Sequence, residues 1–301
     1  MKSRLAPFVL LLALWPALCA HAQEQRRLSV AVLDMGGSPF AERVAERVSK
    51  LLSSVVRSEL KLAVLDRGLS RAAARGVGYN GSLNLTLAEA RTLGAAVGCD
   101  FFIAGDAQTL RRSSSERPVY YESYASLFLV SAQTGRLVTW LRPAAEANTA
   151  AAAEAGLFDA LGEKAVGPYF AGLADAAARA EERERFAVNE GEAAAVIDLS
   201  TEEGAAANKD LREPAPYRRL RPAYTDAAAR AEAEATVDAL VEIGADGEVA
   251  DVRVVRWAGF GLDEEVVETV RRMHFRPAQR DGEAVPVRVL LRYNFRKPPK
   301  S

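Results

Sequence analysis

Residues 236–295 contain two stretches in which apolar side chains recur at every second position. A period of two predicts strands with one covered face. Asp246-Gly247 follows the first stretch and favours the tight turn of a hairpin, so a return strand is expected at 249–256 and a final strand at 285–295. Between these strands, helical spacing is shared by Leu262, Val266, Val267, Val270 and Met273. The region therefore predicts a small antiparallel sheet with one helix.

The final strand is the part of this region that we expect to bind a partner. A strand at the rim of a small sheet lacks a neighbour on one side, and such an edge aggregates, is blunted or accepts another chain. Pro286 and the nearby arginines keep such an edge soluble. The predicted partner-binding edge consists of Val285, Val287, Arg288, Val289, Leu291, Arg292, Tyr293 and Asn294, with Arg288, Arg292 and Asn294 facing outward.

Five short motifs accompany this pattern. They are Pro222-Ala223-Tyr224-Thr225, Asp246-Gly247, Leu262-Asp263, Phe275-Arg276-Pro277-Ala278 and Asp281-Gly282. In this order they resemble the C-terminal domain of TonB-family proteins, the periplasmic part of the energy transducers of Gram-negative bacteria. The resemblance spans about residues 218–296, with Thr225 in place of the family's second proline.

The resemblance implies a function and a further set of contact residues. It implies that the domain accepts an extended segment of an outer-membrane receptor as an added strand. It also implies a receptor contact at Arg221, Pro222 and Tyr224, although well-known members carry glutamine at the position of Arg221.

The N-terminal half predicts an α/β sandwich over residues 23–185. Apolar strands are expected at 28–33, 62–65 and 101–107, helices between them, and a hairpin about Gln133-Thr134-Gly135. Thr86 and Glu89 form a capping box before one helix. Motifs such as Val30-Ala31-Val32-Leu33-Asp34 and Ile103-Ala104-Gly105 resemble TolB-like and CsgG-like periplasmic domains, which implies contacts with other envelope proteins. The expected fold class of the whole chain is α+β.

The first residues predict an export signal. Lys2 and Arg4 precede a short apolar run, and cleavage is expected after Ala22, which removes residues 1–22 and places the chain in the periplasm. The alternative is an uncleaved segment that anchors the chain in the inner membrane. Residues 186–217 are rich in alanine and acidic side chains and are expected to be a linker, followed by the C-terminal domain at 218–301.

Catalytic and metal-binding patterns are weak. Apart from His21 in the expected signal, the chain has one histidine, His274, for which a surface or capping role is expected, and Cys99 is expected to be a buried apolar side chain. Gly36-Gly37-Ser38 carries a weak signal for an anion site, because the lysine of a phosphate loop is missing. The aspartates that end or follow strands favour turn and cap roles over a shared ligand site at one rim; they are Asp34, Asp66, Asp100 and Asp106. We expect no enzyme activity and no cofactor.

Two functions follow as hypotheses. In the first, the chain is a periplasmic protein that binds an outer-membrane receptor or another envelope protein by strand addition, with a link to TonB-dependent transport. In the second, it is an envelope adaptor or regulator whose C-terminal domain only dimerises or tethers. Nucleic acid is not an expected partner because of the export signal, and membrane association is expected to be indirect unless the signal stays uncleaved.

Overall fold

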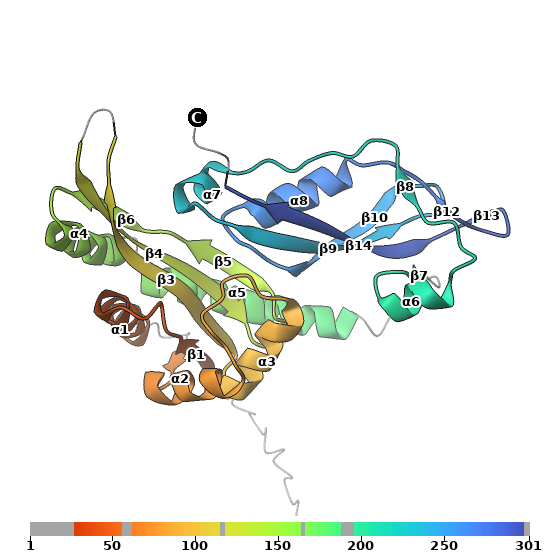
Figure 1. The fold of residues 1–301 in the computed structure, drawn as a ribbon. Helices are drawn as coiled ribbons and strands as arrows, with labels where there is room; N and C mark the ends of the chain where they lie inside the picture. Colours follow the sequence, from red (N-terminus) through yellow and green to blue (C-terminus); the bar gives the residue numbers. More distant parts are fainter. Residues whose placement is uncertain (1–26, 56–61, 115–117, 164–165, 188–195, 298–301) are drawn as a thin grey trace, which may run out of the picture.

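The computed structural model describes residues 27–55, 62–114, 118–163, 166–187 and 196–297, and shows an α+β chain built from two packed units (Figure 1). The expected signal peptide, residues 1–22, lies outside these ranges. Within them, none of the helices combines the length and the apolar character that a membrane span requires.

The N-terminal unit is built on one mixed sheet with the strand order β2-β1-β3-β4-β5, and β6 pairs with the other end of β4. β1 pairs in parallel with β2 and β3, whereas β4 pairs antiparallel with its neighbours. β3 and β4 are the long central strands, paired over their full length. The strands are β1 Leu28–Val32, β2 Leu62–Val64, β3 Phe101–Arg112, β4 Tyr120–Ser131, β5 Leu137–Leu141 and β6 Ala144–Ala147.

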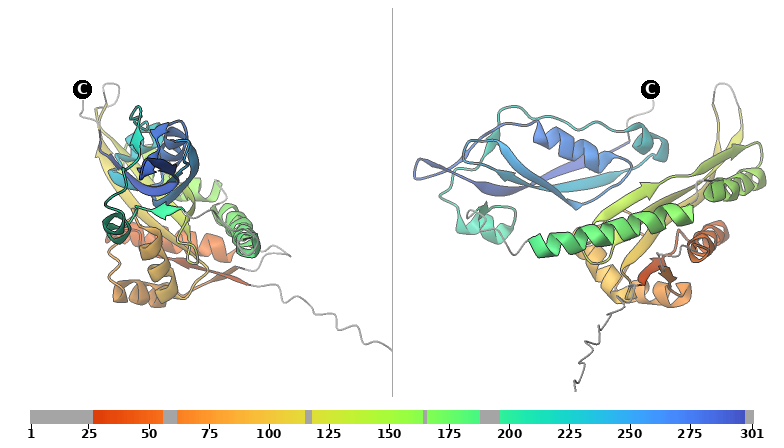
Figure 2. Two further views of the ribbon diagram at one scale, coloured as in Figure 1. Left: turned by 90° about the vertical axis from the view of Figure 1, so that its right-hand side faces the viewer. Right: turned by 180° about the vertical axis from the view of Figure 1, so that it is seen from behind.

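Helices cover this sheet unequally. One face lies against α1 Pro39–Ser53, α4 Ala150–Glu163 and α5 Val166–Ala187, and α5 crosses the back of the unit in Figure 2. On the other face, α2 Arg67–Gly76 lies beside β1 and α3 Leu87–Val97 lies beside the end of β4, so part of this face has no helix of the N-terminal unit over it among the described residues. The strand, helix and hairpin pattern expected from the sequence is present, and the Thr86–Glu89 capping box begins α3. Gly167-Pro168 lies in the first turn of α5, where proline is well tolerated.

The C-terminal unit contains the predicted hairpin, helix and final strand. β9 Ala235–Ile243 pairs antiparallel with β10 Val249–Arg256 on one side and with β14 Val287–Phe295 on the other, while α8 Leu262–Arg271 packs on the sheet. Gly247 in the hairpin turn has a φ of +85°, and a Cβ there would lie 2.0 Å from the Phe275 carbonyl oxygen. The remaining short elements are α7 Asp226–Ala231, β11 Phe275–Arg276, β12 Ala278–Arg280 and β13 Glu283–Val285.

The residues expected to be a linker carry regular structure where the structure describes them. β7 Ile197–Asp198 joins the C-terminal sheet parallel to β14, α6 Glu202–Ala207 follows, and β8 Ala215–Pro216 pairs with β11. The sheet order is thus β10-β9-β14-β7, a mixed sheet rather than a purely antiparallel one.

The two units share a continuous apolar core. The loop between β10 and α8 places Trp257 and Phe260 against the uncovered face of the N-terminal sheet, where Phe128 stacks on Trp257 at a centroid distance of 5.9 Å. Phe260 contacts Phe128 and Trp140 at 5.3 and 5.5 Å. Because aromatic contacts of this kind add to apolar burial, this cluster fixes the C-terminal unit on the N-terminal one.

Polar groups bind the same junction. Asn84, in the loop before α3, accepts a hydrogen bond from the Thr236 N–H at 3.0 Å and donates to the Thr236 and Trp257 carbonyls at 2.8 and 2.6 Å. The Trp257 indole N–H donates to the Gly135 carbonyl at 3.1 Å. Backbone groups that would otherwise be buried without partners are therefore satisfied across the junction.

Candidate protein-binding edge

β14 has one fully paired side. Its residues pair one to one with β9, from Val287 opposite Ile243 to Phe295 opposite Ala235. Val287 and Phe295 are buried, whereas Leu290 is 38% exposed. The odd-numbered side chains therefore pack towards α8, and the even-numbered ones lie on the opposite face of the sheet with Arg288, Arg292 and Asn294.

The other side of β14 is paired only at its beginning. The Ile197 N–H donates to the Pro286 carbonyl at 3.1 Å, and the Leu199 N–H donates to the Arg288 carbonyl at 2.8 Å. Beyond Arg288, the described part of the chain supplies no strand on this side. Because backbone groups alternate along a strand, the N–H and C=O of residues 290, 292 and 294 point the same way as the Arg288 carbonyl.

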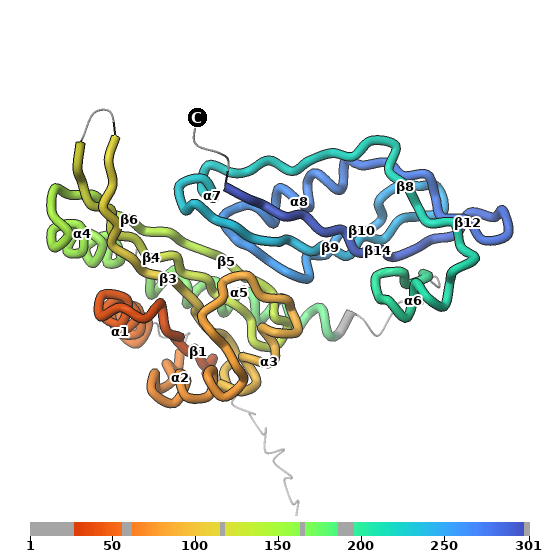
Figure 3. The backbone as a smooth tube through the Cα atoms, viewed as in Figure 1, coloured from red at the N-terminus to blue at the C-terminus, as the bar shows by residue number. Residues whose placement is uncertain are grey.

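A groove follows this unpaired stretch. It has a volume of about 330 Å³ and lies between β14 and the segment 213–220. Figure 3 shows the chain between β8 and α7 running along the length of the C-terminal unit. The groove contains both apolar side chains and strand backbone; it is lined by Pro214, Pro216, Leu220, Met273, Phe275, Val289, Leu290, Leu291, Arg292 and Tyr293, among others.

The arginines predicted at this edge are engaged by carboxylates. Arg292 Nε donates to Asp238 Oδ1 at 2.7 Å, and Arg288 Nη2 donates to Glu242 Oε1 at 2.5 Å. The bond from Arg292 holds the pKa of the Asp238 carboxyl below its usual value, although burial acts in the opposite direction. Asp198 of β7 lies 3.6 Å from Arg288. A partner would therefore meet the strand backbone beside neutralised cations.

The other predicted contact residues are placed differently. Val285 lies on β13, which pairs with β12, and Pro286 separates it from β14. Tyr224 donates its hydroxyl to the Ala228 and Ala233 carbonyls at 3.2 and 2.8 Å, so its hydroxyl is used inside the unit. Thr225 caps α7 through the Ala228 N–H, a contact that a proline could not make. Arg221 is exposed, one residue after Leu220 of the groove.

The side chains considered as candidates for catalysis or metal binding are buried or contact other residues. Burial raises the pKa of the Cys99 thiol to about 12, and His274 Nδ1 lies 2.8 Å from Glu248 Oε1. Among the described residues, no group of three or more side chains is arranged to hold a metal ion.

The strand-end aspartates are engaged as well. Asp34 accepts from Arg71 Nε at 2.8 Å, Asp66 caps α2, and Asp100 accepts from the Ser29 hydroxyl at 2.9 Å. Asp106 accepts from Gln108 and Tyr124, and burial raises its pKa. Asp66 therefore has the expected cap role, whereas Asp34, Asp100 and Asp106 accept hydrogen bonds from other side chains.

The comparison with known families bears on the C-terminal unit. The family model described as the Gram-negative bacterial TonB protein C-terminal matches residues 221–296, which contain β9, β10, α8 and β14. This part of the chain is a TonB-type C-terminal domain. No curated protein matches the chain.

Two solved structures resemble parts of the chain. The solution NMR structure of the Pseudomonas aeruginosa TonB CTD is 22% identical with a TM-score of 0.26, and the match covers 35% of this chain and 96% of that one. The 1.65 Å structure of the hypothetical protein CT253 from Chlamydia trachomatis is 9% identical with a TM-score of 0.26, covering 40% and 73%. The resemblance of residues 23–185 to TolB-like and CsgG-like domains stays a prediction.

The sequence did not predict β7, nor the packing of the loop between β10 and α8 on the N-terminal sheet. Ile197-Asp198 is too short to show a period, and its pairing with β14 is a long-range contact. The pairing of Arg292 with Asp238 could have been found, because antiparallel pairing of the two alternating strands places opposite charges across from each other.

Proposed function

We propose that this chain is a cell-envelope protein whose TonB-type domain binds an extended segment of an outer-membrane receptor or of another envelope protein. The segment adds as a strand to β14 beyond Arg288, next to β7. The observation that carries this proposal is the side of β14 at residues 290–294, where the described chain supplies no strand and a groove of about 330 Å³ runs alongside. Main-chain hydrogen bonds would give affinity there, and the groove would select side chains.

The proposal places the protein in the periplasm and gives it no catalytic role. The family match supports an envelope location, and the export signal predicted at residues 1–22 supports cleavage after Ala22. TonB-dependent transport is the process that this proposal links to the chain.

Photo-crosslinking in intact cells tests the binding edge. A photoreactive residue replaces Leu290, which is exposed beside the groove, and in a second strain replaces Arg43, which is exposed on α1. We expect adducts with an outer-membrane or other envelope protein at position 290, and mass spectrometry should map them to one extended segment of that protein. Adducts with a partner at position 43 but none at position 290 would refute strand addition at β14.

The adaptor function is the second candidate, and the junction between the units favours it. Trp257 and Phe260 fix the TonB-type domain on the N-terminal sheet, which suits a two-domain scaffold better than a domain on a free tether. In that case position 290 would give adducts only with a second copy of the chain, and envelope partners would crosslink at position 43.

A further inference from the structure

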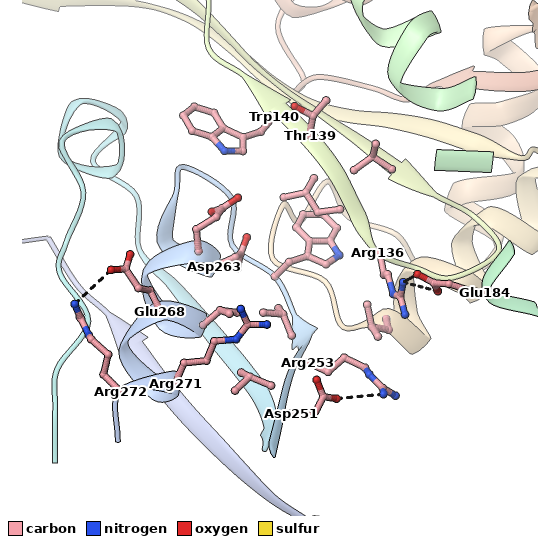
Figure 4. Close-up of a pocket in the computed structure, with 18 residues that line it drawn as sticks. Arg136, Thr139, Trp140, Glu184, Asp251, Arg253, Asp263, Glu268, Arg271 and Arg272 are labelled. Atoms are coloured by element: carbon pink, nitrogen blue, oxygen red, sulfur yellow. Dashed lines mark hydrogen bonds and ion pairs between the residues drawn. The ribbon is translucent and has the colours of Figure 1, made fainter. Parts of the chain in front are cut away.

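A second and larger groove lies between the two units, away from the β14 edge. It has a volume of about 1130 Å³ and separates β5 of the N-terminal sheet from β10 and α8 of the TonB-type domain (Figure 4). Trp140 extends from β5 at one end of it. Its apolar surface is formed by Leu137, Trp140, Val252, Val254, Trp257 and Val267, among others.

Two strand edges border this groove. β5 ends the N-terminal sheet and β10 ends the C-terminal sheet, and within the described ranges the only pairing on either outer side is the bridge between Arg256 and Thr86 at the end of β10. Residues 137–140 of β5 and 251–254 of β10 both line the groove. Unpaired strand backbone above an apolar floor is the surface that binds an extended polypeptide.

Most charges on the groove rim are already neutralised within the chain. Arg136 pairs with Glu184 at 2.9 Å, and Asp251 with Arg253 at 3.4 Å. On α8, Arg272 pairs with Glu268 at 3.3 Å. These pairs leave the rim with little net charge to attract or exclude a ligand.

Arg271 differs from these neighbours. It is exposed, makes no hydrogen bond or ion pair with another described residue, and extends from α8 into the groove in Figure 4. Glu264, two helical turns earlier, is an exposed carboxylate on the same rim. The rim therefore presents a cation at one end and an anion at the other. A segment that fits it carries an acidic side chain near Arg271 and a basic one near Glu264.

We propose that this groove binds an extended segment of a partner protein. The segment pairs with the outer edge of β5, covers the partly exposed Trp140, and places an acidic side chain against Arg271. This site is independent of the β14 edge, because β10 and β14 lie on opposite sides of β9.

The tryptophans give this proposal a direct readout. The sequence has three tryptophans, at positions 15, 140 and 257, so the chain from residue 23 keeps only the two that line the groove. The chain from residue 23, which contains all described residues, serves as the target. Peptides that bind it are selected from a phage-displayed library of random dodecapeptides. The selected peptides are then titrated by intrinsic fluorescence. We expect them to carry an acidic residue and to shift the tryptophan emission.

Three variants assign the binding to the groove. Arg271→Glu should weaken binding roughly fivefold, the scale of an exposed ion pair, and a peptide with lysine in place of its acidic residue should recover it. Arg230→Glu, the matched charge reversal on α7 outside the groove, should bind as the unchanged chain does. Leu290→Pro, which alters the β14 edge, should also leave these titrations unchanged.

Four results would overturn the proposal. They are failure to select any peptide, binding without a change in tryptophan emission, equal effects of Arg271→Glu and Arg230→Glu, and loss of binding in Leu290→Pro alone. A concentration-dependent dimer in sedimentation that Arg271→Glu abolishes would assign the groove to a second copy of the chain instead of a partner.

Discussion

Gly259 offers the most direct test of the junction between the two units. It has a φ of +71°, and a Cβ built there would lie 2.2 Å from Cε1 of Phe128 on the N-terminal sheet. An alanine at this position therefore meets two penalties. The left-handed backbone costs about 1–2 kcal/mol for a residue with a Cβ. The collision with the buried ring costs about 1–3 kcal/mol more, the usual range for overpacking.

Gly282 is the matched control for the backbone penalty. Its φ is +86°, and no atom lies within 4 Å of a Cβ built there. Gly282→Ala should therefore cost only the backbone penalty of about 1–2 kcal/mol. The extra loss of about 1–3 kcal/mol in Gly259→Ala should lower its Tm by roughly 2–12 °C relative to Gly282→Ala, for a chain of this size.

Thermal unfolding followed by far-UV circular dichroism and by tryptophan emission measures this difference. Gly259→Ala should also shift the emission before unfolding, because Trp257 and Trp140 lie in the same aromatic cluster. Replacing Phe128 by leucine in the same variant should restore the part of the stability that the collision with the ring removes, as measured in a double-mutant cycle. Equal losses in Gly259→Ala and Gly282→Ala would show that the two units are not docked as described.

Three further predictions concern charge and the β7 strand. Asp238→Asn should destabilise the chain by about 2 kcal/mol near neutral pH, since hydrogen bonds to charged groups are lost. Because the folded-state pKa of Asp238 is lowered, this stabilisation is present above its unfolded pKa of about 3.9 and is lost as the pH falls further. The Tm values of the unchanged chain and of Asp238→Asn should therefore converge below pH 4 in an acid titration. Burial raises the folded-state pKa of Asp263 to about 7, so between pH 4 and 7 the folded chain holds a proton that the unfolded chain has lost. As the pH rises from 4 to 7, the Tm of the unchanged chain should therefore fall more than the Tm of Asp263→Asn. Parallel Tm curves would contradict this. Leu199→Pro removes the N–H that donates to the Arg288 carbonyl and should lower the free energy of unfolding by about 1 kcal/mol. Hydrogen exchange at the Ile197 amide should become faster. Unchanged exchange there would show that β7 does not depend on this bond.

The strands and helix of the TonB-type domain could be predicted from the sequence because their periods are strong. The alternation at residues 236–243 and 287–295 gave β9 and β14, and Asp246-Gly247 gave the turn between β9 and β10. These features are local, so each is visible within a short window of sequence. The same is true of the Thr86 capping box.

The surroundings of the site could not be predicted in this way. Trp257 and Phe260 stand in a glycine-containing loop without a period, and only the uncovered face of the other unit explains their burial. Likewise β7 restricts the available side of β14 to the residues after Arg288 through a contact across about ninety residues of sequence. Long-range packing of this kind overrides local propensity, which is why the edge is shorter than the sequence predicts.

The central claim is that the backbone of β14 beyond Arg288 pairs with a partner strand. Once crosslinking has identified the partner segment, its affinity for the full exported chain should be compared between Leu290→Pro and Leu290→Ala by titration calorimetry. Both variants lose the exposed leucine side chain, but only proline removes the N–H that points towards the groove. Strand pairing predicts that the alanine variant binds nearly as the unchanged chain does and that the proline variant, still folded by circular dichroism, binds roughly tenfold more weakly, a loss of about 1.4 kcal/mol. Equal affinities of the two folded variants would contradict strand addition at β14.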